Sequence, residues 1–374
     1  MRIAIAGVIT KQITAHPLGG TEAFTSLLID GLVKKGHDVT LYCAQGSQTN
    51  ATRQIEVCKA EEAMGSESNV EFVYPYTLLE IRKIIEDIKE KKFDLLHINV
   101  LKTFLFSYFA DQIPIPMIHT MHRDFLQNKK IFQVYQKIGF HDNEYFVFVS
   151  KSAHKLSFLR HNTFDVFNGI DIAKYPFSKQ GGDKLLWLSR IDPLKGPKEA
   201  ILAVNQAKKQ LMMSGDIDRQ KYQEYFNQEL KSLIVDDITY EKPISLERNI
   251  ELFHHAKAFI FPIQWEEPCP LTVLESMACG TPLIAFARGS LVESVVDGET
   301  GFLVNPSDND IRGSWIVKKT GINGLTEAIE RLYAMSSEKY LAMRKACRNR
   351  AEENYTIDKM VDKYLNIYTQ ILNK

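Results

Sequence analysis

Short apolar segments separated by helical patterns recur along this chain, and this alternation constrains the fold more than any other feature. In the first half the apolar segments fall at 3–8, 38–44, 94–100, 117–122 and 145–150. Strands that are apolar on both faces are typical of a parallel sheet covered by helices on both sides. Amphipathic patterns at 21–35 and 78–92 predict such helices. The sequence therefore predicts an α/β fold with a doubly wound sheet.

The same alternation begins again after residue 178. The second half has a helical pattern at 197–209 and predicted strands at 184–190, 210–215, 238–244, 258–263, 282–286 and 301–304. With 374 residues the chain is long enough for two domains. We predict Rossmann-like domains over 1–168 and 169–355, followed by an amphipathic helix at 356–374. The residues alone leave open which domain this helix packs on.

Charge and hydropathy exclude several classes of protein. Lys plus Arg and Asp plus Glu both number 46, so the net charge of zero gives no broad attraction to nucleic acid, and we expect no nucleic-acid partner. The N-terminus opens into a strand rather than a signal peptide, and no apolar run approaches the roughly 18 residues of a membrane span. We therefore expect a cytoplasmic protein. Peripheral contact with the inner face of a membrane stays open.

The most informative stretch is FPIQWEEPCPLTVLESMACGTPLIAF, at 261–286. We read it as a strand, a loop with Glu266 and Glu267, and a helix that begins near Pro270 and carries Glu275 in its second turn. The free N–H groups of such a helix start attract phosphates and sugar hydroxyls. Read one by one, these glutamates are equally consistent with solvated acids on a loop and a helix.

The stretch LSRIDPLKGP places two cations after another predicted strand. Arg190 ends the strand, and Lys195 lies just before Gly196, Pro197 and a helix. Two cations at a strand tip beside a helix start can stabilise a diphosphate leaving group as its charge develops. The alternative is a solvated pair of cations in a turn.

Two weaker patterns lie in the first half. Gly19 and Gly20 precede a helix and permit close approach of a phosphate or sugar to the backbone, although a flexible turn explains them equally well. His119 and His122 lie in or at the end of a strand, where a single histidine is commonly structural. We expect His119 to be packed. Arg123 and Asp124, which follow, could contact an acceptor.

These motifs together resemble the retaining glycosyltransferases of family 4 (glycosyl transferases group 1). The stretch around Glu267 and Glu275 is similar to the family's E-G-F-G-L-x-x-x-E-A-M-A-x-G-x-P signature, with matches at Glu267, Leu271, Glu275, Met277, Ala278, Gly280 and Pro282. The sequence departs from that signature at Pro268, Cys269, Pro270 and Ser276. Prolines at 268 and 270 exclude donor contacts through those two backbone nitrogens. The segment with Arg190 and Lys195 is similar to the family's S-R-x-x-x-x-K-G.

The resemblance implies a role for each matched residue. Glu267 would lie near the donor sugar and Glu275 would bind the nucleotide ribose. Arg190 and Lys195 would hold the diphosphate. The remaining implied donor-site residues are His122, which would contact the reacting sugar, Gly19 and Gly20 across the cleft, and Pro270, Leu271 and Thr272 at the helix start.

The resemblance also implies the fold and the reaction. The fold would be GT-B, two Rossmann-like domains facing each other across a cleft, with the helix at 356–374 packed back on the first domain. The second domain would bind a UDP- or GDP-sugar, and the first would present the acceptor surface. The sugar would pass, with retained anomeric configuration, to a hydroxyl of a glycan, lipid-linked or small-molecule acceptor. Aromatic and basic residues at 102–137 could line that surface, touch a lipid headgroup or form a solvated face (Lys102, Phe104, Phe106, Lys129 and Lys130).

We expect no cofactor besides the nucleotide sugar and no metal, on the reading that no Asp-x-Asp metal motif ends a strand. Two other enzyme classes share such a two-domain fold, nucleotide-sugar epimerases and phosphorylases. A sugar-binding protein without enzymatic activity is the alternative outside enzymes. The missing signal peptide and the Arg190–Lys195 pair argue against it. The sequence does not indicate the oligomeric state.

Overall fold

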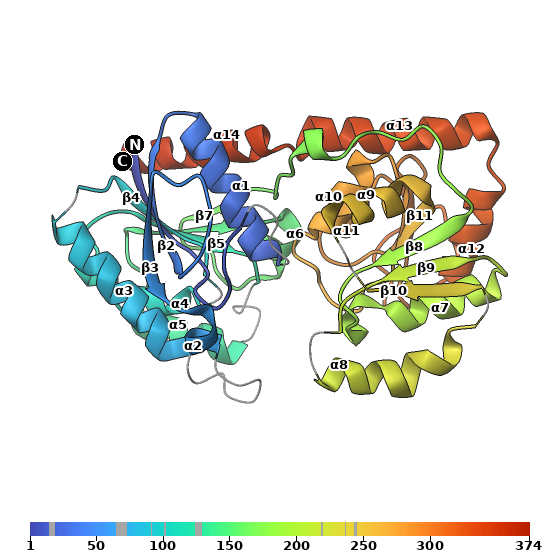
Figure 1. The fold of residues 1–374 in the computed structure, drawn as a ribbon, viewed down its shortest axis with the longest axis horizontal. Coiled ribbons are helices and arrows are strands. Elements are labelled where there is room, and N and C mark those ends of the chain that lie inside the picture. Colours follow the sequence, from blue (N-terminus) through green and yellow to red (C-terminus); the bar gives the residue numbers. More distant parts are fainter. Residues whose placement is uncertain are drawn as a thin grey trace. The chain divides into compact units, whose positions relative to one another are not determined.

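A computed structural model describes residues 1–14, 19–64, 73–90, 92–100, 102–123, 129–217, 220–235, 237–242 and 245–374. The chain forms two compact units (Figure 1). Unit 1 comprises Met1–Gly169 and Ile357–Lys374, and unit 2 comprises Ile170–Thr356. Among the described residues, no helix combines the length and the apolar character needed to cross a membrane.

Unit 1 is built on a seven-stranded sheet in the order β3-β2-β1-β4-β5-β6-β7, and every neighbouring pair is parallel. Its strands are β1 (Arg2–Ala6), β2 (Asp38–Ala44), β3 (Arg53–Cys58), β4 (Leu95–Ile98), β5 (Met117–Met121), β6 (Glu144–Phe148) and β7 (Thr163–Asp165). The central strands are buried along almost their whole length because helices cover both faces of the sheet. The predicted α/β class is thus confirmed for this unit.

The helices of unit 1 are α1 (Gly20–Lys34), α2 (Ala60–Met64), α3 (Val73–Glu90), α4 (Phe104–Ser107), α5 (Lys129–Ile138), α6 (Lys151–Leu156) and α14 (Ile357–Leu372), with a 3₁₀ turn, η2, at Ala110–Gln112. Because side chains alternate along a strand, Ile3 and Ile5 of β1 face α1 and α14, whereas Ala4 and Ala6 face α3. Helix α14 packs directly on α1 (Figure 1).

Unit 2 contains a six-stranded parallel sheet in the order β10-β9-β8-β11-β12-β13. Its strands are β8 (Lys184–Leu188), β9 (Leu211–Ser214), β10 (Ile238–Glu241), β11 (Ala256–Phe261), β12 (Leu283–Phe286) and β13 (Gly301–Val304). The longer helices are α7 (Pro197–Gln206), α9 (Leu246–His255), α10 (Leu271–Ala278), α12 (Gly321–Tyr333) and α13 (Ser337–Asn354), and the shorter ones are α8 (Gln220–Tyr225), η6 (Phe226–Leu230) and α11 (Leu291–Ser294).

In both sheets, the chain adds strands first on one side of a central strand and then on its other side. In unit 1 the chain places β2 on one side of β1 and β4 on the other, and in unit 2 it places β9 and β11 on opposite sides of β8. Ligands of open α/β sheets bind beyond the carboxyl ends of the strands at such a point. We therefore expect a ligand-binding site of unit 2 at the loops that follow β8 and β11.

Candidate functional site

The loop after β8 carries Arg190 and a short 3₁₀ turn, η5 (Pro193–Lys195). The strand ends at Leu188, so Arg190 lies in the loop rather than at the strand end predicted from the sequence. Asp192 caps the turn, and its carboxylate accepts hydrogen bonds from the Arg190 guanidinium at 3.3 Å and the Tyr222 hydroxyl at 2.8 Å. The guanidinium also lies over the Tyr222 ring, 5.3 Å from its centroid. These contacts fix Arg190 while 40% of its side chain stays exposed.

Gly196 lets this loop approach the end of β11. Its φ of 70° is in the left-handed region, and a Cβ there would lie 1.9 Å from the carbonyl oxygen of Pro262. Only glycine fits such an approach without displacement of the backbone. The indole N–H of Trp187 donates to the carbonyl of Lys195 at 3.1 Å and holds the loop from inside the sheet.

Lys195 and Glu267 meet at this point. The Lys195 ammonium donates a short hydrogen bond to Oε2 of Glu267, and the indole N–H of Trp265 donates to the same oxygen at 3.0 Å. Both side chains are largely buried, with 17% of Lys195 and 11% of Glu267 exposed. The ammonium lies over the Trp265 ring, 5.3 Å from its centroid. The sequence singled out both residues but did not show that they form an ion pair.

Glu266 faces a different network, which the sequence did not reveal. Its carboxylate accepts the backbone N–H of Gly289 at 2.7 Å and forms ion pairs with Arg312 at 2.8 Å and Arg288 at 3.5 Å. The same two arginines bind Asp310, and the hydrogen bond from Arg312 holds the pKa of that carboxyl below its usual value. Glu266 is therefore a bound structural acid and not a solvated one.

Helix α10 presents the next group of predicted residues. Pro270 is the N-cap residue and not part of the first turn. The helix therefore begins at Leu271, one residue after Pro270. Leu271 and Thr272 form the partly exposed start of the helix. The Glu275 carboxylate accepts a hydrogen bond from the Tyr175 hydroxyl at 3.0 Å, and burial raises the pKa of Glu275 to about 7. Glu275 can thus accept or donate a hydrogen bond near neutral pH.

The remaining predicted residues belong to unit 1. His122 follows β5, with Nε2 3.4 Å from the Asn99 side-chain oxygen and its ring edge-on to Phe24 at 4.5 Å. Burial lowers the pKa of His122 to about 3, so the imidazole is neutral at physiological pH. Gly19 is the N-cap of α1, and among the described residues no atom beyond the chain neighbours and backbone of α1 lies within 4 Å of a Cβ built on Gly20.

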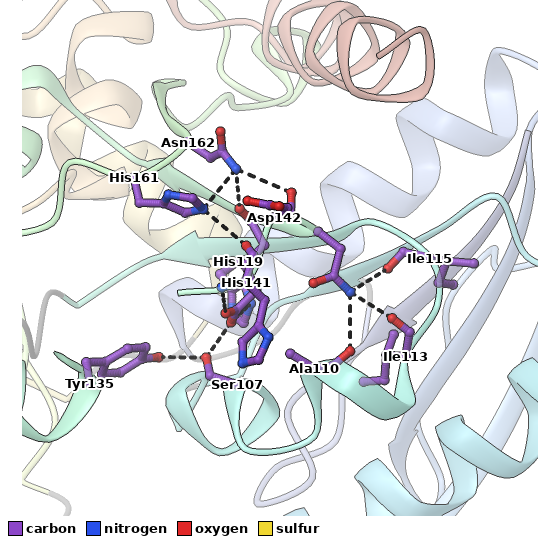
Figure 2. Close-up of polar contacts among 12 residues, drawn as sticks. Ser107, Ala110, Ile113, Ile115, His119, Tyr135, His141, Asp142, His161 and Asn162 are labelled. Atoms are coloured by element: carbon purple, nitrogen blue, oxygen red, sulfur yellow. Dashed lines mark hydrogen bonds and ion pairs between the residues drawn. The ribbon is translucent and has the colours of Figure 1, made fainter. Parts of the chain in front are cut away.

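His119 is a packed residue, as expected. Its ring is fully buried between β5 and β6, with Nε2 3.4 Å from the Glu144 carboxylate. Figure 2 shows this contact beside Ser107, whose hydroxyl donates a short hydrogen bond to Glu144 and lies 3.5 Å from the Tyr135 hydroxyl. Of the two residues that follow His122 in the sequence, Arg123 is exposed and Asp124 lies outside the described residues.

Two expectations from the sequence need correction. Phe106, named for the acceptor surface, is fully buried in the core of unit 1 and cannot line a groove. The reading that no Asp-x-Asp motif follows a strand is also wrong, because Asp216–Asp218 follows β9 and Asp308–Asp310 follows β13. In the second motif Asp310 binds Arg288 and Arg312, and Asp308 accepts a hydrogen bond from Thr320. Asp218 lies outside the described residues.

Comparisons with known proteins agree with this architecture. The family model of the glycosyl transferases group 1 matches residues 171–352, and the model of glycosyltransferase family 4 matches residues 18–172. The spore coat protein SA of Bacillus subtilis is 21% identical over 90% of this chain and 91% of its own length. The glycogen synthase of Mycobacterium tuberculosis is 30% identical, but over only 38% of this chain and 36% of that enzyme.

Solved structures show the same fold. Sucrose-phosphate synthase from Thermosynechococcus elongatus superposes with a TM-score of 0.78 at 18% identity, with full coverage of both chains. The Anabaena protein HepE in complex with UDP-glucose gives a TM-score of 0.72 at 16% identity, over 99% of this chain and 100% of that chain. With both halves matched by the two family models and the fold shared throughout, the chain belongs to the group 1, family 4 glycosyltransferases and has their GT-B fold.

Proposed function

We propose that this glycosyltransferase moves a sugar from a UDP- or GDP-sugar to a hydroxyl acceptor with retention of anomeric configuration. The observation that carries the proposal is the meeting of Lys195 and Glu267 beyond the carboxyl ends of β8 and β11, next to the start of α10. A cation for the departing phosphate and a carboxylate for the sugar hydroxyls are thereby held side by side.

The proposed mechanism assigns the leaving group to unit 2. Lys195, Arg190 and the first turn of α10 stabilise the diphosphate as the glycosidic bond breaks. The departing phosphate oxygen accepts the proton of the acceptor hydroxyl on the same face of the sugar, so no protein nucleophile is required. The Glu267 carboxylate accepts hydrogen bonds from hydroxyls of the donor sugar. Glu275 binds the ribose, for which a carboxyl group with a pKa of about 7 can serve as acceptor or donor.

The neutral imidazole of His122, on unit 1, is assigned to the reacting sugar, and the backbone at Gly19 and Gly20 to the donor. A neutral ring can accept or donate a hydrogen bond without adding charge beside the developing oxocarbenium ion. The donor choice is supported by HepE, which was solved with UDP and with UDP-glucose. The acceptor would be a glycan, a lipid-linked sugar or a small molecule, reached from the cytoplasm with or without peripheral membrane contact.

The test is acceptor-dependent release of nucleoside diphosphate from a panel of UDP-, GDP-, ADP- and dTDP-sugars. We expect release with one nucleotide series, stimulated by a hydroxyl acceptor, and a product whose anomeric proton shows the donor's configuration. An epimerase would change the sugar without releasing nucleotide, and a phosphorylase would require inorganic phosphate. Either result, or an inverted product, would contradict the proposal.

We further propose that transfer needs no metal ion. Of the two Asp-x-Asp motifs, the one after β13 has Asp310 already neutralised by two arginines. Excess EDTA should therefore leave the transfer rate within about twofold of its untreated value, since the Lys195 and Arg190 cations take the place of a metal at the diphosphate. A rate that EDTA abolishes and Mg²⁺ or Mn²⁺ restores would contradict this part of the proposal.

A further inference from the structure

The two cations assigned to the diphosphate are each already neutralised by a carboxylate. Lys195 is bound to Glu267, and Arg190 is bound to Asp192. A diphosphate that binds Lys195 must therefore compete with Glu267 for the ammonium. This competition lowers the affinity for a nucleoside diphosphate below that of a site with an unpaired lysine.

The geometry favours exchange of the ammonium over movement of Glu267. Among the described residues, both hydrogen bonds to the Glu267 carboxylate fall on Oε2, one from Lys195 and one from the Trp265 indole at 3.0 Å. When the ammonium turns toward a phosphate, Trp265 still holds the carboxylate. Lysine suits such an exchange, because its ammonium has three donors on a flexible stem. The backbone of Lys195 stays fixed by the hydrogen bond from Trp187.

We propose that Glu267 acts as a competing counter-ion that promotes release of the nucleoside diphosphate after transfer. As the diphosphate leaves, the Lys195–Glu267 ion pair forms again and offsets the loss of the phosphate contact. Without Glu267, a lysine that is only 17% exposed would be left without its carboxylate, which is costly for a largely buried charge. This inference rests on the proposed function and adds a second role for Glu267 beside its contact with the sugar.

The decisive variant is Glu267→Gln, which keeps the size of the side chain and removes its charge. Titration calorimetry with UDP, GDP and ADP should show that the nucleotide bound by the wild-type protein binds this variant about fivefold more tightly, the factor that corresponds to an ion pair of roughly 1 kcal/mol. The gain should come from slower dissociation, measured by stopped flow. Transfer should nevertheless be slower, because the sugar loses its carboxylate contact and product leaves more slowly.

A second variant separates the proposal from plain repulsion between Glu267 and phosphate. In a Lys195→Ala background, Glu267→Gln should change nucleotide affinity by less than about twofold, because the competition requires the ammonium. The matched control is Glu327→Gln, which breaks an ion pair with Arg331 on α12 in the same unit and should leave nucleotide affinity unchanged. Circular dichroism spectra and Tm values check that each variant is folded. Glu267→Asp, which keeps the charge on a shorter stem, should give an affinity between wild type and Glu267→Gln.

The outcomes distinguish this inference from the proposed function. Unchanged or weaker binding by Glu267→Gln would overturn the competing role while leaving the donor site intact. Tighter binding that persists without Lys195 would also overturn it, because the effect would then be direct repulsion. If the folded wild-type protein binds none of the three nucleotides but turns over a donor with a different base, that nucleotide replaces them as the probe. If it binds no nucleoside diphosphate, the proposed function and this inference both fail.

Discussion

The Glu275 side chain should cost the protein stability at neutral pH. Burial raises the pKa of Glu275 from 4.5 to about 7, with the Tyr175 hydroxyl bond acting in the opposite direction. The folded protein therefore binds a proton between these pH values that the unfolded chain does not, and stability falls as pH rises from 4.5 to 7. Well above pH 7, where both the folded and the unfolded chain have lost this proton, the loss of stability reaches about 3 kcal/mol.

Glu275→Gln should remove this loss, because glutamine has no charge and its side-chain oxygen can still accept the bond from Tyr175. Scanning calorimetry at pH 5 and pH 8 measures the effect. We expect a Tm close to that of wild type at pH 5 and a higher Tm at pH 8, by about 2–4 °C for each kcal/mol gained. Glu330→Gln, at an exposed position of the same unit, is the control and should change neither value.

The gain in stability should be accompanied by a loss of function. If Glu275 binds the ribose, Glu275→Gln weakens nucleotide binding and raises KM more than it lowers kcat, because ribose contacts act equally on ground and transition states. Retention of a destabilising carboxyl at a binding site is the expected trade-off. A Tm at pH 8 that is unchanged or lower would refute the reasoning on burial. Unchanged nucleotide affinity would refute the ribose role.

Three further substitutions test other parts of the site. Lys195→Ala removes one proposed diphosphate cation, so kcat should fall about 10²- to 10³-fold in the transfer assay, and a loss below about threefold would exclude Lys195 from catalysis. Gly196→Ala places a Cβ 1.9 Å from the Pro262 carbonyl oxygen at a φ of 70°, so Tm should fall by many degrees or the soluble protein should be lost. A Tm within about 1 °C of wild type would contradict the expected backbone strain. Glu266→Gln removes the charge that binds Arg312, and Tm should fall by about 2–6 °C, whereas an unchanged Tm would show that the pair contributes no stability.

The sequence predicted the central strands of both sheets because most of their residues are apolar. It missed β3 and β7, the two edge strands of unit 1. Half of the residues in the segment RQIEVC of β3 are exposed, and β7 has only three partly buried residues. These two edge strands therefore carry little of the apolar signal on which the prediction depended, whereas β13, an edge strand of unit 2 that is buried along its whole length, was predicted.

The sequence singled out the residues of the candidate site but not the contacts among them. Glu267 and Lys195 lie 72 positions apart, and neither spacing nor residue type indicates that the loops after β8 and β11 meet. Their contact follows from the sheet order, which places β11 beside β8. The sequence likewise did not predict the ion pairs of Glu266, because its partners Arg288 and Arg312 lie on later loops.

The central claim is that unit 2 binds a nucleoside diphosphate through Lys195. A thermal-shift measurement with UDP, GDP, ADP, dTDP and NAD on the wild-type protein and on Lys195→Ala tests it most directly. A ligand at 100 times its Kd stabilises a folded protein by about 2.7 kcal/mol, which is readily seen in Tm. We predict a shift with one nucleoside diphosphate that is clearly smaller, though still measurable, in Lys195→Ala. A shift with NAD alone, or no shift with any of the five, would contradict the claim.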